Sequence, residues 1–328
     1  MAINRVEIKN FTVFNDVSID FNSGINVIIG ENGTGKTHLL KLIYAFCLLQ
    51  KTSDLYSFKF KIEEMFASND TSNLFNFNHD KIDIVIEDNK KIYKISITKE
   101  NYFEIADTKE YIIPAVFIPA KEMLSMSNIT RIHDKYSKEL SLDKTLLDII
   151  RKSQNIKPNN PPELAKNIIS KLEKIIDGEV FVKNDNSFWI RKSNQSEIPF
   201  SMEAEGLRKF GLLWQLIMNE SITDNTVLLW DEPEANINPK LIPDLVEMVL
   251  ELSRNGVQVF ISTHDYILAK YFEVKRKEND SVRFHSLYKT NEGVKCESNI
   301  NFRDLNNNSI IIAFDELMDE VINRNMGD

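Results

Sequence analysis

Cysteine, glycine and long apolar runs are all scarce in this sequence of 328 residues, which contains 2 cysteines and 10 glycines. Cys47 and Cys296 form no C-x-x-C pair, which excludes a disulfide framework and a cysteine metal site, so both are expected to be packing residues. The longest apolar stretch, residues 39–49, is interrupted by Lys41 and is too short to span a bilayer. The first residues, Met-Ala-Ile-Asn-Arg, lack the apolar segment of a secretory signal. We therefore expect a cytoplasmic protein with no membrane segment.

Positive charge is also in deficit, since 40 Lys and Arg against 49 Asp and Glu give a formal net charge of -9. This balance argues against a protein whose whole surface is a nucleic-acid footprint, although a local basic patch stays possible. The basic run of residues 270–277 contains an acid and is followed by more, which favours an ordinary solvated surface. With 42% hydrophobic and 27% charged residues, the composition is that of a globular protein with a sizeable core.

A glycine-rich stretch at residues 24–37, Gly-Ile-Asn-Val-Ile-Ile-Gly-Glu-Asn-Gly-Thr-Gly-Lys-Thr, matches the P-loop pattern G-x-x-x-x-G-K-[ST]. The motif requires a strand before it and a helix after it. Residues 26–29 are typical of a buried strand, and residues 38–49 are typical of an apolar helix. In such a loop, backbone N–H groups surround a phosphate, and the start of the helix adds the positive end of its dipole. The sequence therefore predicts ATP binding.

Each polar residue of this loop has an expected task. Lys36 is expected to reach the β- and γ-phosphates, and Thr37 is expected to offer its hydroxyl to Mg²⁺. The predicted nucleotide-binding residues of the loop are Gly30, Glu31, Asn32, Gly33, Thr34, Gly35, Lys36, Thr37 and His38.

A second motif, Val-Leu-Leu-Trp-Asp-Glu-Pro-Glu at residues 227–234, is an apolar strand that ends in adjacent carboxylates. Adjacent carboxylates repel each other, so a buried strand that ends in them is expected to meet a divalent cation. Asp231 is predicted to hold Mg²⁺, and Glu232 is predicted to orient or deprotonate the water that attacks the γ-phosphate. The alternative is a strand that simply ends in a charged turn.

A third strand, residues 257–263, is followed by His264. The carboxyl ends of parallel strands meet at one ligand crevice, so His264 is expected to face the same phosphates and to donate to a γ-phosphate oxygen. A structural histidine that precedes the next helix is the competing interpretation. The other histidines show no metal-ligand spacing, and no side-chain role is assigned to His38, His79, His133 and His285.

Apolar periodicity predicts an α/β fold with a parallel P-loop sheet, an antiparallel flank and an inserted helical lobe. The predicted division is residues 1–119, 120–200 and 201–328. Residues 51–80 are expected to be a loop with little regular structure, residues 120–178 are expected to be mainly helical, and the segments near 282–288 and 294–296 are predicted to be edge strands. The other expected strands are 5–8, 18–21, 81–86, 91–98, 111–118, 179–182, 188–191, 226–230 and 257–261, and the other helices are 140–151, 162–176, 203–219, 239–252, 266–272 and 309–322.

Together, the motifs resemble an ATP-binding-cassette head, of the branch shared by RecF, chromosome-maintenance proteins and the overcoming-lysogenisation-defect family of AAA-annotated ATPases. The phrase Asp-Glu-Pro-Glu-x-x-x-x-Pro at residues 231–239 is similar to that of Septu and PARIS anti-phage ATPases. The resemblance implies that two heads form a homodimer that sandwiches two ATP molecules, each site being completed by a signature motif of the partner. The residues that carry the resemblance are Asn10-Phe11, the P-loop, Ile118-Pro119-Ala120, the Asp231 motif and Ser262-Thr263-His264.

The signature is where the sequence departs from this family. The expected position carries Ser201 and Gly206, but Ala204 and Glu205 stand where a Ser-Gly-Gly signature would offer small residues. Acids near a phosphate are unfavourable, and the same segment also suits an ordinary helix capped by Ser201. Two basic residues, Arg208 and Lys209, are candidates for the missing cation. The loop after residue 118 lacks the family's glutamine and leaves Lys121 or Glu122 for a metal or water contact.

Three functions are compatible with these observations. The first is a cytoplasmic ATPase that dimerises on ATP and switches a separate effector, a nuclease or toxin, in phage defence. Residues 301–328 present their acids on a helix-like face only, so a nuclease is expected on another polypeptide. The second is a RecF-like module that ATP clamps on DNA, which requires a basic groove. The third is the ATPase subunit of a transporter, which the missing signature and glutamine disfavour.

Overall fold

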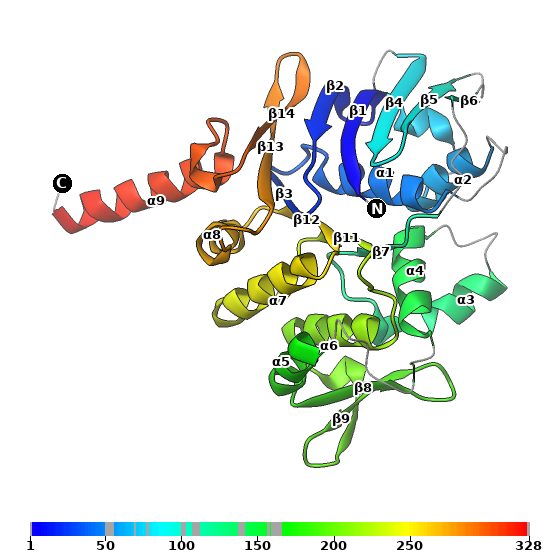
Figure 1. Ribbon diagram of the computed structural model, residues 1–328, viewed down its shortest axis with the longest axis vertical. Helices are drawn as coiled ribbons and strands as arrows, with labels where there is room; N and C mark the ends of the chain where they lie inside the picture. Colours follow the sequence, from blue (N-terminus) through cyan, green and yellow to red (C-terminus); the bar gives the residue numbers. More distant parts are fainter. Residues whose placement is uncertain are drawn as a thin grey trace.

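The structure, a computed structural model, describes residues 2–49, 56–68, 70–76, 79–99, 103–106, 112–136, 142–155, 158 and 166–326 (Figure 1). The strands are β1 (Ile3–Phe11), β2 (Phe14–Asp20), β3 (Ile25–Gly30), β4 (Lys81–Asp88), β5 (Ile92–Thr98), β6 (Phe103–Ala106), β7 (Ala115–Ile118), β8 (Gly178–Val182), β9 (Phe188–Lys192), β10 (Glu197–Pro199), β11 (Val227–Asp231), β12 (Gln258–Thr263), β13 (Val282–Thr290) and β14 (Gly293–Asn299). The helices are α1 (Lys36–Cys47), α2 (Tyr56–Met65), α3 (Ile129–Lys135), α4 (Lys144–Ser153), α5 (Lys166–Ile176), α6 (Glu205–Met218), α7 (Ile242–Arg254), α8 (Tyr266–Lys275) and α9 (Ser309–Met326).

The central sheet carries the P-loop strand. Its order is β14-β13-β3-β12-β11-β7, and the strands from β13 to β7 are parallel while β14 is antiparallel. Every residue of β3, β11 and β12 is buried, which explains why these strands are continuous apolar runs without polar alternation. The carboxyl ends of the parallel strands therefore meet along one edge, where the P-loop begins.

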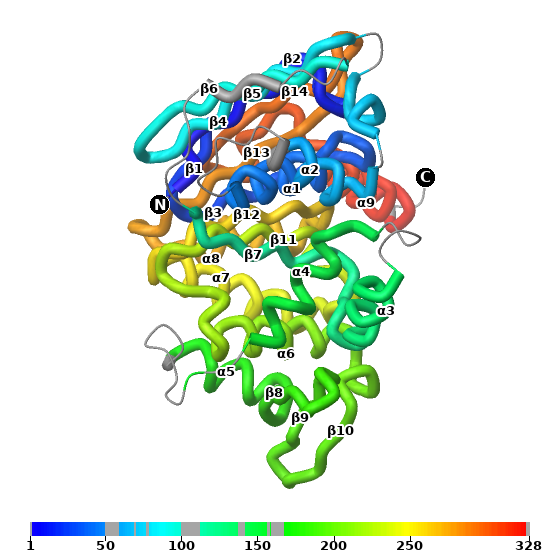
Figure 2. Tube along the Cα trace, turned by 90° about the vertical axis from the view of Figure 1, so that its right-hand side faces the viewer, coloured from blue at the N-terminus to red at the C-terminus, as the bar shows by residue number. Residues whose placement is uncertain are grey.

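Two apolar cores cover the two faces of this sheet. One core joins α1 and the antiparallel sheet to side chains such as Ile28 and Phe260, and the other joins α6, α7 and α8 to side chains such as Val27 and Ile261. Both views show this layering, with the antiparallel sheet at one end of the molecule and the β8–β9 hairpin at the other (Figures 1 and 2). Adjacent residues of one strand thus serve opposite cores, as the two-residue period of a strand requires.

The antiparallel flank has the strand order β2-β1-β4-β5-β6. In β4 the buried residues alternate with more exposed ones, because only one face of this sheet packs on the core. The predicted hairpin of residues 81–98 is confirmed, with Ile84 opposite Ile95.

Between β7 and β11 the chain forms α3 to α6 and the small sheet β10-β9-β8. Side-chain amides tie this region together, since Gln215 Nε2 donates to Ser153 O over 2.6 Å and Asn219 Nδ2 donates to Lys152 O over 2.8 Å. The predicted fold class, an α/β head with an antiparallel flank and a helical lobe, is confirmed. The division at residues 119/120 and 200/201 stays a prediction.

Several expectations were wrong in detail. Residues 51–80 include α2 and a 3₁₀ turn at Thr71–Leu74, because Ile62 and Met65 are buried against the core. β13 is an interior strand between β14 and β3. The hairpin near residue 185 gains a third strand, β10. Parts of these expectations lie outside the described residues, namely residues 51–55, 69, 77–78, 111, 137–141, 156–157 and 159–165.

None of the helices that the structure describes combines the length and the apolarity that crossing a bilayer requires.

Candidate nucleotide-binding site

The P-loop is shaped by glycines that no other residue could replace without strain. Gly35 precedes α1 at φ 90°, and a Cβ there would lie 2.6 Å from the Phe14 ring. Gly30 ends β3 at φ 149°, and its Cβ would lie 2.3 Å from Leu287 O. Inside the loop, Thr34 Oγ1 donates to Glu31 O over 2.9 Å, which closes the turn. Glycine backbone geometry and this hydrogen bond thus fix the shape of the loop.

Lys36 lies across this loop. Its ammonium donates to Gly30 O over 2.7 Å and to Glu31 O over 3.0 Å. Burial lowers the pKa of Lys36 below its usual range, while the carboxylates of Glu232 and Asp231 oppose that shift. Within the described part of the chain its hydrogen-bond partners are these two carbonyl groups, and several carboxylates lie near it. A phosphate could replace the carbonyls as its partner.

The P-loop and the end of β11 meet through two side chains that are 194 residues apart. Thr37 Oγ1 lies 2.9 Å from Asp231 Oδ2 and 3.1 Å from Asp231 Oδ1. Ser262 of β12 also donates to Asp231. Burial raises the pKa of the Asp231 carboxyl above its usual range, and the hydrogen bonds from Ser262 and Thr37 oppose this shift.

These residues fit a divalent cation. Asp231 is a buried carboxylate with hydroxyl donors around it, and a hydroxyl next to a carboxylate is a donor set that Mg²⁺ accepts. Among the residues that the structure describes, no group of three or more His, Cys, Asp and Glu could hold a metal ion. A cation here would therefore depend on phosphate oxygens and water for its remaining ligands.

Glu232 and His264 form a pair beside this site. Nδ1 of His264 lies 3.2 Å from Oε1 of Glu232, and both side chains are partly exposed. Glu232 has a left-handed backbone with φ 44°, which is uncommon for a residue other than glycine, and its N–H donates to Ser262 O over 3.0 Å. The structure thus brings His264 to the crevice that the strand order predicts.

Ser201 lies in a 3₁₀ turn, Phe200–Met202, and is exposed. The expectation that Ser201 caps a helix beginning near residue 203 is wrong, because α6 begins at Glu205 and its N-cap, Ala204, makes no side-chain hydrogen bond. The buried Phe200 ring draws these residues into a separate turn. Gly206 packs against the segment after β11, where its Cβ would lie 2.6 Å from Asn236 O.

The basic residues of α6 contact other parts of the same chain. Arg208 Nη1 lies 2.9 Å from Glu122 Oε2. Lys209 Nζ donates to Glu232 O over 2.9 Å and to Pro233 O over 3.3 Å. Burial lowers the pKa of Lys209 to about 8, although Glu234 and other acids oppose the shift. In this structure Arg208 and Lys209 stabilise the loops around β7 and β11. The Glu122 carboxylate pairs with Arg208.

Several site residues had no signal in the sequence. Lys289, at the end of β13, donates to Asn32 O over 3.1 Å and so places a further cation beside the P-loop. Thr263 Oγ1 donates to Glu234 Oε1 over 2.6 Å, which ties β12 to the turn after β11. These side chains meet because of the order of the strands in the sheet. Lys289 could have been predicted to lie beside the P-loop only if β13 had been recognised as the neighbour of β3.

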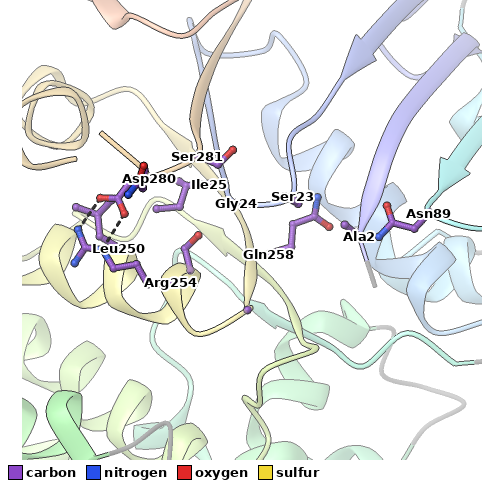
Figure 3. Close-up of a pocket in the computed structure, with 13 residues that line it drawn as sticks. Ala2, Ser23, Gly24, Ile25, Asn89, Leu250, Arg254, Gln258, Asp280 and Ser281 are labelled. Atoms are coloured by element: carbon purple, nitrogen blue, oxygen red, sulfur yellow. Dashed lines mark hydrogen bonds and ion pairs between the residues drawn. The ribbon is translucent and has the colours of Figure 1, made fainter. Parts of the chain in front are cut away.

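A different cleft of about 390 Å³ opens at the amino ends of the parallel strands (Figure 3). Several of its polar side chains make hydrogen bonds within the protein. Arg254 makes two hydrogen bonds of 2.8 and 2.6 Å to the Asp280 carboxylate, and Gln258 Nε2 donates to Ile3 O over 2.8 Å. Ligands of parallel sheets bind at the carboxyl ends of the strands, and this cleft lies at the opposite edge. We therefore do not assign it to the nucleotide.

The chain is similar to known proteins in parts of its sequence and in its fold. The profile of a family described as "AAA domain, putative AbiEii toxin, Type IV TA system" matches residues 25–269. The DNA replication and repair protein RecF of Pediococcus pentosaceus is 38% identical over 73 residues, and RecF of Oenococcus oeni is 30% identical over 97 residues. These matches cover 21% and 30% of this chain but only 20% and 22% of the two RecF proteins.

Solved structures with a similar fold include an SMC head bound to the C-winged helix domain of ScpA. That match has a TM-score of 0.61 at 13% identity and covers 91% of this chain and 97% of the other. The SMC head domain from Thermotoga maritima matches with a TM-score of 0.50 at 15% identity and covers 90% of this chain and 98% of that domain. At these identities the likeness concerns the fold.

Proposed function

The chain belongs to the AAA domain family whose profile it matches, as an ATPase of the ABC, SMC and RecF kind, and on that premise we propose that it hydrolyses MgATP. The observation that carries the proposal is the contact of 2.9 Å between Thr37 of the P-loop and Asp231 of β11. Two side chains 194 residues apart meet there at the ends of neighbouring elements, beside a lysine held by the loop. A contact of this kind is what a shared Mg²⁺ requires.

In this proposal the P-loop residues 30–38 surround the phosphates, and Lys36 exchanges its contacts with Gly30 O and Glu31 O for the β- and γ-phosphates. Thr37 and Asp231 hold Mg²⁺, which neutralises the charge that develops on the phosphates. Glu232 orients the attacking water and accepts its proton, and His264 donates to a γ-phosphate oxygen. The contact between Glu232 and His264 keeps both side chains at the same crevice.

We propose further that two heads close on ATP, with Ser201 and Gly206 of one head near the γ-phosphate bound to the other. The exposure of Ser201 supports this role. Gly206 lies against Asn236, in the turn that follows Glu232, so a change at the hydrolytic residue can reach the signature segment through one contact. Arg208 and Lys209 are engaged within their own subunit and take no part in the proposed trans contact.

The proposed biological role is to switch a separate effector, a nuclease or toxin, in phage defence. The family description, which names a toxin and a toxin–antitoxin system, supports this role. An SMC head of similar fold binds a partner protein, ScpA, which supports the use of such a head as a docking platform. Both points concern relatives, and the partner of this chain is part of the proposal. Its cytoplasmic location is likewise proposed.

A second candidate function is a RecF-like clamp on DNA, which the RecF matches favour. The basic run of residues 270–277 offers it little support, because Lys270 pairs with Glu273 and Lys275 lies 3.6 Å from Glu247. Acids that neutralise a run of lysines remove the field that attracts DNA.

Native mass spectrometry of Glu232→Gln, with and without MgATP, tests these proposals. The variant is expected to bind ATP, to lose hydrolysis and to accumulate as a dimer, whereas Lys36→Ala is expected to bind no nucleotide. A fully active Glu232→Gln enzyme would overturn the assignment of the water-orienting residue. Coexpression with neighbouring gene products distinguishes the functions, because an effector held or released by nucleotide supports the switch. An ATP-dependent dimer without a partner, which shifts duplex DNA, supports the clamp.

A further inference from the structure

Helix α9 extends away from the rest of the molecule (Figure 1). Its first turn is anchored, since Ile310 is buried in the core and Asn308 Oδ1 accepts the N–H of Ile311 over 3.2 Å. Every described residue from position 312 to position 325 is exposed. A helix of this length has little stability of its own in water, because most helices depend on packing of an apolar face. The exposed turns of α9 therefore lack the cover that the first turn has.

The exposed part of α9 is amphipathic. Five large apolar side chains recur at spacings of three and four residues and so share one face of the helix. This face continues the one that holds the buried Ile310 and the partly buried Ile311 in the first turn. We name these five residues the α9 stripe; their exposed fractions run from 36% to 55%, and they are Phe314, Leu317, Met318, Val321 and Ile322.

The opposite side of the same turns is acidic. Between positions 312 and 325 the helix carries Asp315, Glu316, Asp319 and Glu320 against the single Arg324. Acids at these positions alternate with the stripe, so they occupy the remaining faces of the helix. A surface with an apolar centre and an acidic margin complements a partner with an apolar face and a basic margin.

The base of the stripe touches the candidate nucleotide site. The Phe314 ring stacks on the Tyr266 ring, with centroids 4.1 Å apart and an interplanar angle of 2°. Tyr266 begins α8 two residues after His264. A cleft of about 740 Å³ lies between these parts, lined by Asn32 and His264 on one side and by Phe314 on the other. A displacement of His264 would thus reach α9 through one ring contact.

From these observations we propose that the α9 stripe docks a partner polypeptide through a basic amphipathic helix, and that the Tyr266–Phe314 stack couples this docking to the nucleotide. The coupling rests on the proposed ATPase function, whereas the docking surface does not. A second copy of the chain is the poorer occupant. It would set the acids of one α9 beside those of another in a protein whose net charge is already -9.

The test uses a labelled synthetic peptide of leucine and lysine at helical spacing, matched to the 18-residue length of α9. Fluorescence anisotropy with the full chain measures its Kd. Wild type is expected to bind this peptide, and the double variant L317S/V321S is expected to bind at least about tenfold more weakly, since it removes two apolar contacts. The matched control is V274S/I300S, two apolar residues that are more exposed than any residue of the stripe. This control is expected to keep the wild-type Kd.

Three results would overturn the docking surface: an equal loss in the control variant, equal binding of a leucine–glutamate peptide of the same spacing, or peptide affinity that ignores L317S/V321S. Sedimentation of the chain without peptide tests whether a second copy of the chain occupies the stripe instead. A wild-type self-association that L317S/V321S abolishes would make the stripe a contact between copies and would also overturn the proposal.

The coupling is measured as the ratio of peptide Kd values with and without a saturating non-hydrolysable ATP analogue. A ratio of about threefold or more is expected for wild type and a ratio near one for Tyr266→Leu, which loses the ring stack. A wild-type ratio of one would contradict the coupling. If the chain binds no nucleotide while the stripe results hold, the proposed function fails and the docking surface stands. If ATP is hydrolysed and the stripe results fail, only the docking inference falls.

Discussion

Arg208 of α6 and Glu122, which follows β7, form an ion pair with 2.9 Å between guanidinium nitrogen and carboxylate oxygen, although they are 86 residues apart. The Glu122 side chain is only 2% exposed, and its other oxygen accepts the N–H of Leu124 and Ser125. The pair connects the loop after β7 to the first turn of α6. The ATP-binding-cassette heads that this chain resembles carry a glutamine in the corresponding loop, and this chain does not.

Replacing Arg208 by Ala is expected to destabilise the fold by about 3 kcal/mol, because it leaves the buried Glu122 carboxylate without its cation. Urea denaturation measures this change. Adding Glu122→Gln to the variant is expected to recover part of the loss, since the remaining side chain is neutral.

Arg191→Ala is the matched control, because Arg191 is 40% exposed and its pairs with Glu179 and Glu197 lie at the surface. Its expected cost is about 0.5 kcal/mol. Equal losses for Arg208→Ala and Arg191→Ala would show that burial does not strengthen the pair with Glu122.

Gly206→Ala is expected to push α6 away from the turn after β11, because the new Cβ would lie 2.6 Å from Asn236 O. A backbone oxygen cannot yield as a flexible side chain does, so the expected loss of unfolding free energy is about 1–3 kcal/mol. Thermal unfolding measures it. The exposed Ser201→Ala is the control and should leave the midpoint unchanged. A Gly206→Ala protein as stable as wild type would mean that the contact with Asn236 is loose.

Thr37→Val is expected to raise the Mg²⁺ concentration needed for half-maximal ATP hydrolysis roughly tenfold or more, because it removes a hydroxyl that contacts Asp231. Thr37→Ser keeps the hydroxyl and should retain the wild-type requirement. A magnesium titration of phosphate release compares the three proteins. An unchanged requirement in Thr37→Val would exclude Thr37 as a metal ligand.

His285 is expected to make the fold sensitive to acid. Its ring is fully buried, and its nitrogens lie 2.8 Å from Ser298 Oγ and 3.2 Å from Asn26 Oδ1. Burial lowers the pKa of His285 from 6.5 to about 3. Between those values the unfolded chain binds a proton that the folded chain does not, so the folded state loses about 1.4 kcal/mol per pH unit as the pH falls below 6.5.

His285→Gln is expected to lose this component of the pH dependence, and the exposed His79→Gln is expected to keep it. Urea denaturation between pH 7 and pH 4 measures the slopes. Identical slopes for wild type and His285→Gln would contradict a neutral, buried His285.

The sequence predicted those parts of the site in which the reactive side chains and the residues that shape the backbone stand within one short segment. The P-loop is such a segment, since its glycines, Lys36 and Thr37 adjoin the strand and the helix that they require. The apolar runs of β11 and β12 likewise placed Asp231 and His264 at the same edge of the sheet. The roles of these residues stay predictions.

The sequence could not predict contacts that depend on which strands become neighbours. Glu122 and Arg208 are separated by 86 residues, and no local pattern links them. β13 alternates in a way that suits an edge strand, yet it lies beside β3 and brings Lys289 to the P-loop. Helix α2 was missed because Phe58, Phe60 and Ile62 alternate with lysines in the sequence, a period that does not indicate a helix. Burial of Ile62 and Met65 decides its fold.

The position of β3 between β12 and β13 has a consequence for biosynthesis. Both neighbours of β3, which ends at Gly30, begin at or after Gln258, so its backbone groups have no partners in the sheet until most of the chain has been made. At common rates of translation this interval lasts roughly ten seconds or longer. During that time the apolar P-loop strand is exposed to chaperones and to other nascent chains, and a ribosome that stalls before residue 258 would release a product unable to bind ATP.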